Sequence, residues 1–433
     1  CLTSEPQPQA GGPNRSVTKQ TQLVPQLRFP EFASDEAWNS LPLHKLAKRI
    51  TQRNNQGADL RPLTNSAERG VVDQREYFDK DIAKNTDNYF VVEHGDYIYN
   101  PRISSTAPVG PISKNQVGTG VVSPLYTVFR FRNESDDFFA HYFRSSHWHG
   151  YLKRVSNSGA RHDRMAITND DLMRMPMPTP SQRERRKIAG CLGSLDDLIA
   201  AEGRKLEALR RHKEGLMLQL FPQEGATVPL LRFPEFLDAG EWEEKRLGDL
   251  GELVSGLTYS PSDVREDGLL VLRSSNIQSD ETSLDDCVYV RRDVSGANLT
   301  QPNDILICVR NGSKSLIGKN AIVPEGMPVC THGAFMTVFR AAAPHFARVL
   351  LQTAAYQKQV AADLGATINS INGSQLLKYR FMVPMPAEQL RITACLSSLN
   401  EALAGQSWKL ELLRMHKQGL LNRLFPSLES VGR

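Results

Sequence analysis

Leu-Arg-Phe-Pro-Glu-Phe, residues 27–32, reappears letter for letter at residues 231–236, which is 231 − 27 = 204 positions further along the chain. A second match keeps the same distance, because Leu-Phe-Pro at residues 220–222 recurs at residues 424–426. Between these anchors the two copies differ at most positions. Two anchors at one spacing indicate a duplicated unit, which has to be recognised before local structure is assigned.

Length and composition fit a protein with more than one core. The 433 residues exceed what one hydrophobic core usually organises. Hydrophobic residues make up 40% and charged residues 23%, and no run of about eighteen apolar residues could span a membrane. The six cysteines contain no Cys-x-x-Cys pair, which favours reduced thiols in a cytoplasm. A net charge of +4 permits a nucleic-acid partner without requiring one.

The first 22 residues read as a disordered tail. They are rich in Gln, Pro, Ser and Gly and contain almost no large apolar side chain. The sequence starts at Cys1, for which a lipid-anchored cysteine and a truncated start are the two interpretations. The composition of the remaining chain favours the second.

Two heptad patterns follow the two divergent segments. Ser181 with Glu184 forms a capping box that predicts a helix start, and Pro222 and Pro426 end the two patterns. Apolar residues alternate in steps of four and three, which is typical of a coiled-coil seam. The seam residues are Ile188, Leu192, Leu195, Ile199, Leu206, Leu209, Leu216 and Leu220 in the first helix and Ile392, Leu396, Leu399, Leu403, Leu410, Leu413, Leu420 and Leu424 in the second.

Helices of roughly 40 residues are about 60 Å long and need a partner along their length. We expect the two to pack antiparallel on each other with a pseudo-two-fold relation. The alternatives are that each seam binds another protein, or that the helices join two separate chains. Glu202, Lys213, Gln406 and Lys417 fill the polar seam positions, and Glu202 opposite Lys417 is the expected cross-pair.

The divergent segments read as two copies of one mixed α/β fold. Gly95–Asn100 resembles Asn303–Ile307, and Val128–Arg130 resembles Val338–Arg340. We therefore predict two globular domains separated by the two helices. The predicted order is a tail (1–22), a first globular domain (23–178), a first helix (179–222), a linker (223–230), a second globular domain (231–383) and a second helix (384–427).

The loops of both globular segments are polar and basic. Arg and Lys can bind guanine edges or phosphates, and Asn suits the donor and acceptor pair of adenine. The candidate DNA-binding residues are Arg102, Ser104, Ser105, Lys114, Asn115, Arg154, Arg161 and Arg164 in the first segment and Arg273, Ser274, Asn276, Arg310, Asn311, Lys314, Asn369 and Asn372 in the second.

A search for catalytic motifs finds no complete set. The Asn/Asp-Pro-Pro-aromatic motif of adenine methyltransferases is absent, and no glycine-rich stretch has the spacing of a nucleotide site. His147 and His149 could supply half of a metal site, and Glu243 with Lys245 forms a nuclease-like pair. Packed histidines and a solvated turn are the simpler interpretations, so we predict no metal and no catalytic residue in this chain.

Two variable globular units, each followed by a repeated helix, resemble the specificity subunit of a type I restriction–modification system. The resemblance rests on the lead-ins at 27–32 and 231–236, on Gly-Asp-Tyr-Ile-Tyr-Asn at 95–100, on Pro-Met-Pro at 176–178 and 384–386, and on the Leu-Phe-Pro helix ends. It covers residues 23–427.

This resemblance implies two target recognition domains, each reading one half of a split double-stranded DNA target. It implies helices that set the gap between the halves, and two methyltransferase subunits docked on the helices and lead-ins. From the same resemblance we expect S-adenosylmethionine and ATP on partner subunits, restriction and translocase subunits as further partners, and a bacterial or archaeal cytoplasm as the setting. The alternatives are a metal-dependent nuclease fused to a recognition module, which would need Glu243 or His149, and a coiled-coil adaptor that binds proteins.

Overall fold

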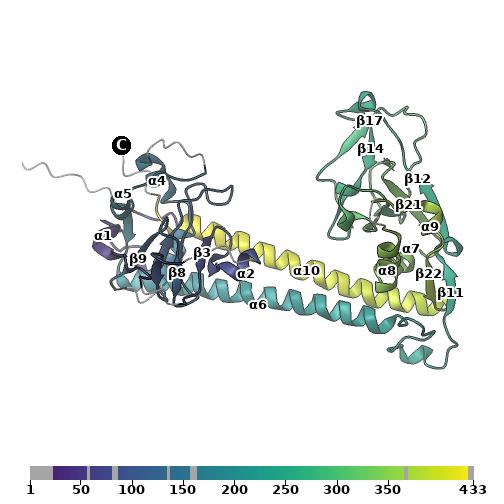
Figure 1. The fold of residues 1–433 in the computed structure, drawn as a ribbon, viewed down its shortest axis with the longest axis horizontal. Coiled ribbons are helices and arrows are strands. Elements are labelled where there is room, and N and C mark those ends of the chain that lie inside the picture. Colours follow the sequence, from purple (N-terminus) through teal and green to yellow (C-terminus); the bar gives the residue numbers. More distant parts are fainter. Residues whose placement is uncertain are drawn as a thin grey trace, which may run out of the picture. The chain divides into compact units, whose positions relative to one another are not determined.

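The structure is a computed structural model that describes residues 23–55, 59–79, 86–133, 137–156, 163–364 and 369–427. The predicted tail and Arg161 lie outside these residues. The chain divides into two units (Figure 1), of which the first contains residues up to 203 together with those from 409 onward, and the second contains residues 204–408. Within the described ranges, no helix has the length and apolar character needed to cross a bilayer.

The first unit is built on a four-stranded antiparallel sheet in the order β2-β9-β6-β7. Outside this sheet, β1 pairs with β10, β3 with β4 and β5 with β8, all antiparallel. The elements are η1 (Pro30–Phe32), β1 (Asn39–Pro42), α1 (Leu43–Leu46), β2 (Ala47–Ile50), β3 (Leu63–Ser66), β4 (Gly70–Asp73), α2 (Gln74–Phe78), β5 (Phe90–Val92), β6 (Tyr97–Tyr99), β7 (Ile112–Lys114), β8 (Gly120–Val122), β9 (Thr127–Phe131), α3 (Phe138–Phe143), α4 (His149–Val155), α5 (Asn169–Met173) and β10 (Pro176–Thr179).

The second unit repeats this plan with the antiparallel sheet β12-β21-β18-β19 and the strand pair β11·β22. It adds a second four-stranded sheet, β13-β17-β14-β20, in which β14 and β20 are parallel. The elements are η2 (Pro234–Phe236), β11 (Glu243–Arg246), η3 (Leu247–Asp249), β12 (Gly251–Ser255), η4 (Pro261–Asp263), β13 (Val264–Arg265), β14 (Leu269–Leu272), η5 (Ser274–Asn276), β15 (Ile277–Gln278), β16 (Glu281–Thr282), β17 (Val288–Val290), β18 (Ile305–Cys308), η6 (Lys314–Leu316), β19 (Asn320–Ile322), β20 (Cys330–His332), β21 (Met336–Ala341), α7 (Pro344–Leu350), α8 (Ala354–Asp363), α9 (Gly373–Leu376) and β22 (Arg380–Val383).

An ion pair at the same place in both sheets explains the sequence resemblances between the two copies. Arg130 on β9 contacts the carboxylate of Asp96 at 2.6 Å, and Arg340 on β21 contacts Asp304 at 2.8 Å. Asp96 is fully buried and Asp304 is 2% exposed. A buried carboxylate has to be paired. The pair therefore fixes each central strand against the turn before its neighbouring strand.

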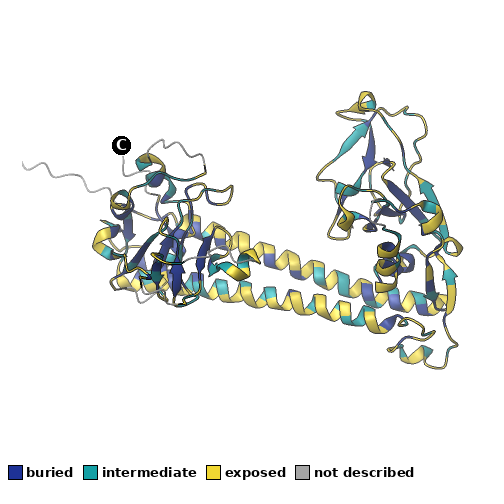
Figure 2. Cartoon of the chain, viewed as in Figure 1, coloured by how far each residue is buried: buried dark blue, intermediate teal, exposed yellow. Residues whose placement is uncertain are grey.

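Hydrophobic side chains fill the space around each central sheet. Figure 2 shows buried residues concentrated in the strands of both units and exposed residues over much of the long helices. In the first unit, Trp38 and Phe138 share a core with Leu192 of the first helix. In the second unit, Trp242 and Phe339 share a core with Leu396 of the second helix. Each globular domain is thus anchored on the helix that follows it.

A buried ion pair also ties each lead-in to the helix after its globular domain. The two helices are α6 (Gln182–Leu220) and α10 (Pro386–Leu424). Arg28 donates from Nε and Nη2 to the two carboxylate oxygens of Glu184, both at 2.7 Å. Arg232 makes the same two bonds to Glu388 at 2.8 and 2.7 Å. Both glutamates are 1% exposed. These pairs hold the repeated lead-in on the first turn of the repeated helix.

The predicted capping box is only half formed, because of this ion pair. The Ser181 hydroxyl accepts a hydrogen bond from the backbone N–H of Glu184 at 3.2 Å. The Glu184 carboxylate does not return to Ser181 but binds Arg28, and it also accepts a bond from Trp38 Nε1 at 3.0 Å. In the second unit, the Nε1 of the corresponding Trp242 is buried without a hydrogen-bond partner among the described residues.

A backbone hydrogen bond is repeated in the same way. The N–H of Leu27 donates to the carbonyl of Arg423, and the N–H of Leu231 donates to the carbonyl of Gln219, both at 2.9 Å. Donor and acceptor are each shifted by 204 residues, since 231 − 27 and 423 − 219 both equal 204. Each lead-in therefore lies on the last turns of a long helix.

Segments of α6 and α10 pack antiparallel within each unit. In the first unit, Lys409 pairs with Glu202 and Lys417 pairs with Asp196. The residue numbers of each pair add up to nearly the same value, 611 and 613, as antiparallel pairing requires. The predicted ion pair between Glu202 and Lys417 is wrong, because each of these residues pairs with a residue about two helical turns away from the predicted one. A heptad pattern looks the same after a shift of seven residues, so the sequence could not fix the register.

The predicted seam residues lie along this pairing. Eight of the sixteen are buried and eight are half-buried. The buried ones are Ile188, Leu192, Leu206, Leu220, Ile392, Leu396, Leu410 and Leu424, and the half-buried ones are Leu195, Ile199, Leu209, Leu216, Leu399, Leu403, Leu413 and Leu420.

His141 on α3 gives the first unit a pH dependence. His141 is 4% exposed, neither ring nitrogen has a hydrogen-bond partner among the residues that the structure describes, and Asp196 lies 3.8 Å from Nδ1. Burial, together with the charges of Arg144 and Lys417, lowers the pKa of His141 from 6.5 to about 4. The unfolded chain therefore binds a proton at higher pH than the folded chain does. Stability that is present above pH 6.5 is lost as the pH falls toward 4, by up to about 3 kcal/mol.

Denaturant unfolding of wild type and His141→Phe between pH 8 and pH 4 tests this expectation. The difference in stability between the two proteins should stay constant from pH 8 to 7 and should shift in favour of the variant below pH 6.5. A difference that is independent of pH across the whole range would contradict it. The comparison is needed because burial also lowers the pKa of His149 to about 4.

Candidate nucleic-acid interface

Three loops of the second unit meet beyond the end of β18. Asn311 donates from Nδ2 to the hydroxyl of Ser274 at 3.0 Å, and Asn369 donates from Nδ2 to the carbonyl of Gly312 at 3.1 Å. Arg310 forms an isolated β-bridge with Ser370. The structure thus brings together four of the predicted site residues, namely Ser274, Arg310, Asn311 and Asn369. Lys314 lies exposed on η6, four residues beyond Arg310.

The side chain of Arg310 is exposed and lies against an exposed aromatic ring. Its guanidinium carbon is 5.8 Å from the centre of the Phe335 ring, and Phe335 is 57% exposed. A cation on an aromatic face gains modest stabilisation at an exposed site. Within the described part of the chain, Arg310 makes no ion pair. Its guanidinium is therefore a strong candidate for binding a phosphate or a base edge.

The corresponding loop of the first unit carries Arg102, Ser104 and Ser105, all exposed. Arg102 forms a β-bridge with Arg164, and both guanidinium groups lie near Asp163, at 3.8 and 3.7 Å. Asp163 partly neutralises this pair of arginines. Arg154 is also exposed, on α4.

A cavity of about 500 Å³ adjoins this loop. Its lining combines the loop residues with side chains that the sequence reasoning did not select, including Gln74, Tyr77 and Tyr126. The Tyr126 hydroxyl lies 3.1 Å from that of Thr64. Hydroxyl and amide groups around a concave surface suit the hydrogen-bonding edges of nucleotides. These residues were missed because α2 and β3 are far from residue 102 in the sequence.

Two predicted site residues are structural. Asn115 is fully buried and donates from Nδ2 to the carbonyls of Glu93 and Gly118, both at 2.8 Å. Asn276 is also fully buried and donates from Nδ2 to the carbonyls of Ser283 and Asp286 at 2.9 and 3.0 Å. An amide whose two donors are used inside the protein cannot read a base. Both predictions are therefore corrected, and these asparagines stabilise loops.

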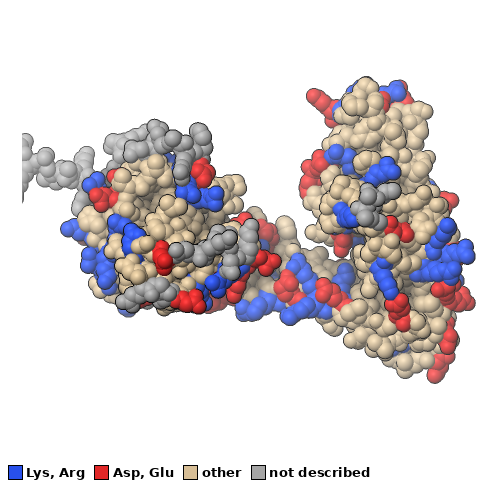
Figure 3. Space-filling model, in the orientation of Figure 1, with Lys and Arg blue, Asp and Glu red and all other residues tan. Residues whose placement is uncertain are grey.

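Three further candidates already have partners within the fold. Lys114 pairs with Asp137 at 2.7 Å, and Arg273 pairs with Asp286 at 2.8 Å. Asn372 caps α9, where its Oδ1 accepts a bond from the N–H of Ser374 at 2.9 Å. They belong to the candidate surface only if DNA displaces these contacts. In Figure 3, basic and acidic side chains are interspersed over the visible face of each unit, in keeping with the small net charge.

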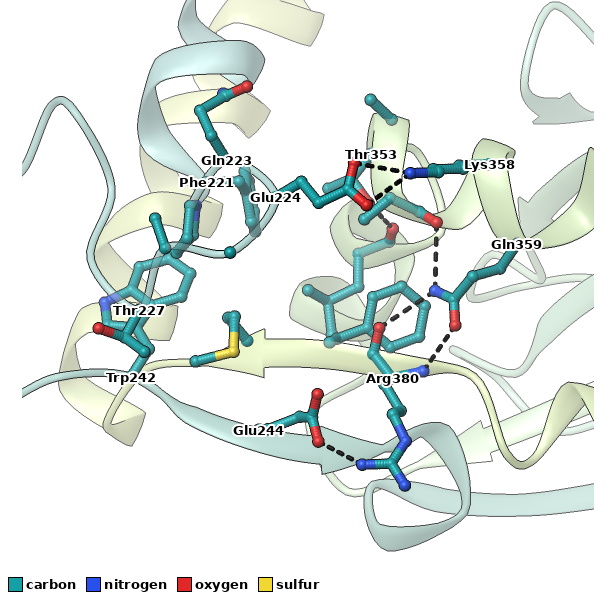
Figure 4. Close-up of a pocket in the computed structure, with 18 of the residues that line it drawn as sticks. Phe221, Gln223, Glu224, Thr227, Trp242, Glu244, Thr353, Lys358, Gln359 and Arg380 are labelled. Carbon is teal, nitrogen blue, oxygen red and sulfur yellow. Dashed lines mark hydrogen bonds and ion pairs between the residues drawn. The ribbon is translucent and has the colours of Figure 1, made fainter.

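A larger cavity, of about 870 Å³, lies in the second unit beside the end of α6. Figure 4 shows the rings of Phe221 and Trp242 on one side of it and charged side chains from several elements around it. Lys358 pairs with Glu224 at 2.6 Å, and Arg380 pairs with Glu244. An apolar floor with a charged rim is typical of a protein-binding surface.

The residues weighed for catalysis have structural surroundings. Lys245 and Glu243 form an exposed ion pair at 3.3 Å on β11. His147 contacts the carbonyl of Asn422 at 3.1 Å through Nε2. Among the described residues, no group of three or more His, Cys, Asp or Glu side chains is placed to hold a metal ion.

Comparison with known proteins agrees with this architecture. The family model of the type I restriction modification DNA specificity domain matches residues 239–411. The StySPI specificity subunit from Salmonella potsdam is 26% identical over 194 residues, 42% of this chain and 42% of that protein. The EcoKI specificity subunit from Escherichia coli K12 is 28% identical over 168 residues, 36% of each chain.

The fold likeness extends over most of the chain. The crystal structure of the type I restriction–modification S subunit from M. genitalium matches with a TM-score of 0.56 at 14% identity, over 94% of this chain and 100% of that one. The fold of this chain is therefore similar to that of a type I S subunit. Residues 239–411 match the family of type I restriction modification DNA specificity domains, and these two specificity subunits are similar to the chain over about two fifths of its length. The sequence alignments span about two fifths of the length of these two curated relatives.

Proposed function

We propose that this chain is the DNA-recognition subunit that directs methyltransferase subunits, and restriction subunits with them, to a two-part DNA target. One observation carries the proposal: the central sheet and the buried ion pairs occur in both units, while the loops at the ends of the sheet strands differ. The sheets β2-β9-β6-β7 and β12-β21-β18-β19 share one order, and the ion pairs Arg28–Glu184 and Arg232–Glu388 repeat at a spacing of 204 residues.

The structural differences between the two copies support the proposal that each copy recognises a different DNA half-site. The second unit carries the sheet β13-β17-β14-β20, where the first has the strand pairs β3·β4 and β5·β8. The loops beyond β6 and β18 carry Arg102 and Arg310 in different surroundings. Contacts to phosphates would supply affinity that depends on salt, and contacts to base edges would supply specificity. In this proposal the first and second globular domains are the two target recognition domains.

The repeated surfaces suit two copies of one partner. The lead-ins are identical over six residues, and the starts of α6 and α10 bind them through the same buried ion pairs. They can therefore present similar docking sites to two methyltransferase subunits, and the cavity beside Trp242 lies next to one of them. S-adenosylmethionine, ATP and every bond-breaking step would then belong to partner chains in a bacterial or archaeal cytoplasm. The paired helices would act as the spacer between the half-sites.

Methylation mapping tests the proposal. DNA from cells that express the chain with its methyltransferase subunit should carry adenine methylation at a bipartite sequence. Replacing residues 43–175, which lie between the paired strands β1 and β10, with those of another family member should change one half of that sequence and leave the other intact. Methylation by the chain alone, or a change in both halves, would contradict the proposal.

A further inference from the structure

The central sheets allow residues of the two units to be matched one by one. Tyr97 pairs with Phe129 between β6 and β9, and Ile305 pairs with Phe339 between β18 and β21. Each of these phenylalanines precedes an arginine, Arg130 or Arg340, that contacts the aspartate before the neighbouring strand. Register and ion pair thus give the same match. Counting along the chain from these paired residues therefore matches the loop residues at this end of the central strands in the two units.

Counting back from the central strands matches Leu125 with Phe335. Each is the second residue of the turn that leads into β9 or β21. Leu125 is 59% exposed and Phe335 is 57% exposed, while Met336, the next residue, is 2% exposed. A single exposed apolar residue is ordinary on a protein surface. Two at matched positions in copies whose loops have otherwise diverged indicate a shared role.

Counting forward from β6 and β18 matches Arg102 with Arg310. A third segment confirms this match, because the N–H of Met165 donates to the carbonyl of Pro101 at 2.9 Å and the N–H of Ile371 donates to the carbonyl of Val309 at 2.8 Å. Each arginine directly follows one of these acceptors. Each unit therefore carries an arginine and an exposed apolar side chain on two neighbouring segments. Both segments lie at the same end of the two central strands of that unit's sheet.

The second unit shows how close these two groups lie. The backbone N–H groups of Val309 and Arg310 both donate to the carbonyl of Phe335 at 3.1 Å, and the Arg310 guanidinium lies over the Phe335 ring. Asn311 and Ser274 hold the loop beside them. Both groups are therefore positioned before any ligand binds.

We infer that Leu125 and Phe335 are base-reading residues, each contacting the methyl group of a thymine in the major groove of its own half-site. Arg102 or Arg310 contacts a neighbouring guanine edge. Thymine is the only base that presents an apolar group in the major groove, and guanine presents the two acceptors that an arginine fork binds. An arginine with an adjacent apolar side chain matches both. The inference rests on the proposed function and adds the chemistry that each domain reads.

The test removes only the methyl group. In the bipartite target defined by methylation mapping, each thymine is replaced in turn by deoxyuridine, and binding of the complex of full-length chain and methyltransferase subunit is measured. Wild type should lose about fourfold in affinity at one thymine in each half-site, as expected for one buried methyl group. Phe335→Ala should abolish this loss in the second half-site only, and Leu125→Ala should abolish it in the first half-site only.

Each variant is a control for the other, because each should leave the opposite half-site unchanged. Leu299→Ala is a further control, since Leu299 is 52% exposed and its carbonyl lies near Arg340, at the far end of β21 from Phe335. If wild type discriminates no thymine from deoxyuridine, or if the variants keep the discrimination, the inference is overturned while the bipartite target stands. If no sequence-specific target exists, the proposed function itself fails.

Discussion

Replacing Arg232 with alanine should lower the free energy of unfolding of the second unit by about 3–5 kcal/mol, because it leaves a buried charge without its partner. The Glu388 carboxylate is 1% exposed and receives two bonds from Arg232. The Trp242 indole, which could have compensated, makes no hydrogen bond among the described residues. Denaturant unfolding of the full-length protein, followed by hydrogen exchange in the first turns of α10, measures the loss.

The matched change in the first unit is Arg28→Ala, and it should cost less. Glu184 keeps the bond from Trp38 Nε1 at 3.0 Å, so its charge retains one donor. Lys358→Ala serves as the exposed control, because Lys358 and Glu224 are 68% and 83% exposed and ion pairs at such exposed sites contribute little to stability. An Arg232→Ala protein as stable as the Lys358→Ala protein would show that the buried pair does not stabilise the lead-in.

Adding one heptad to each long helix should lengthen the unread gap of the DNA target without changing either half-site. Seven residues inserted after Gly203 and seven after Trp408, with the same seam spacing, leave every pairing on either side of the insertions intact. The pairs Glu202–Lys409 and Asp196–Lys417 both lie on one side of them. Seven helical residues add about 10 Å, which is about three base pairs.

Inserting the heptad in α6 alone is the decisive comparison. The antiparallel register then cannot be kept on both sides of the insertion, so the seam must slip by two turns in one unit. We expect this protein to lose bipartite methylation or to be much less stable. Methylation mapping of both insertion proteins checks the expectation. An unchanged gap in the double-insertion protein would exclude the helices as the spacer.

The sequence predicted the features that depend on short-range pattern. The 204-residue repeat, the heptad spacing and the likeness of Val128–Arg130 to Val338–Arg340 are all visible without coordinates, because each reflects local periodicity or identity. The helix register was not visible. It depends on where Leu192 and Leu396 enter the cores of the globular domains, and those cores combine residues from distant parts of the chain.

The candidate interface was predicted by residue type, which does not show which of the selected side chains are exposed and which are used inside the fold. Asn115 and Asn311 look alike in sequence, yet the first is buried by its own turn while the second faces the loop of Ser274. Phe335 was overlooked because an aromatic residue next to a strand is normally assigned to the core. Its match with Leu125 becomes visible only when the two sheets are aligned by register.

The repeated hydrogen bond at the lead-ins has a consequence for the order of the two copies. Leu231 is joined to Gln219 by a short stretch of chain, whereas Leu27 reaches Arg423 with no such covalent link, and both contacts measure 2.9 Å. The same junction between a lead-in and a helix end thus forms in both units, although a short stretch of chain spans it in the second unit only. A circularly permuted chain, joined at one junction and opened at the other, should keep both contacts.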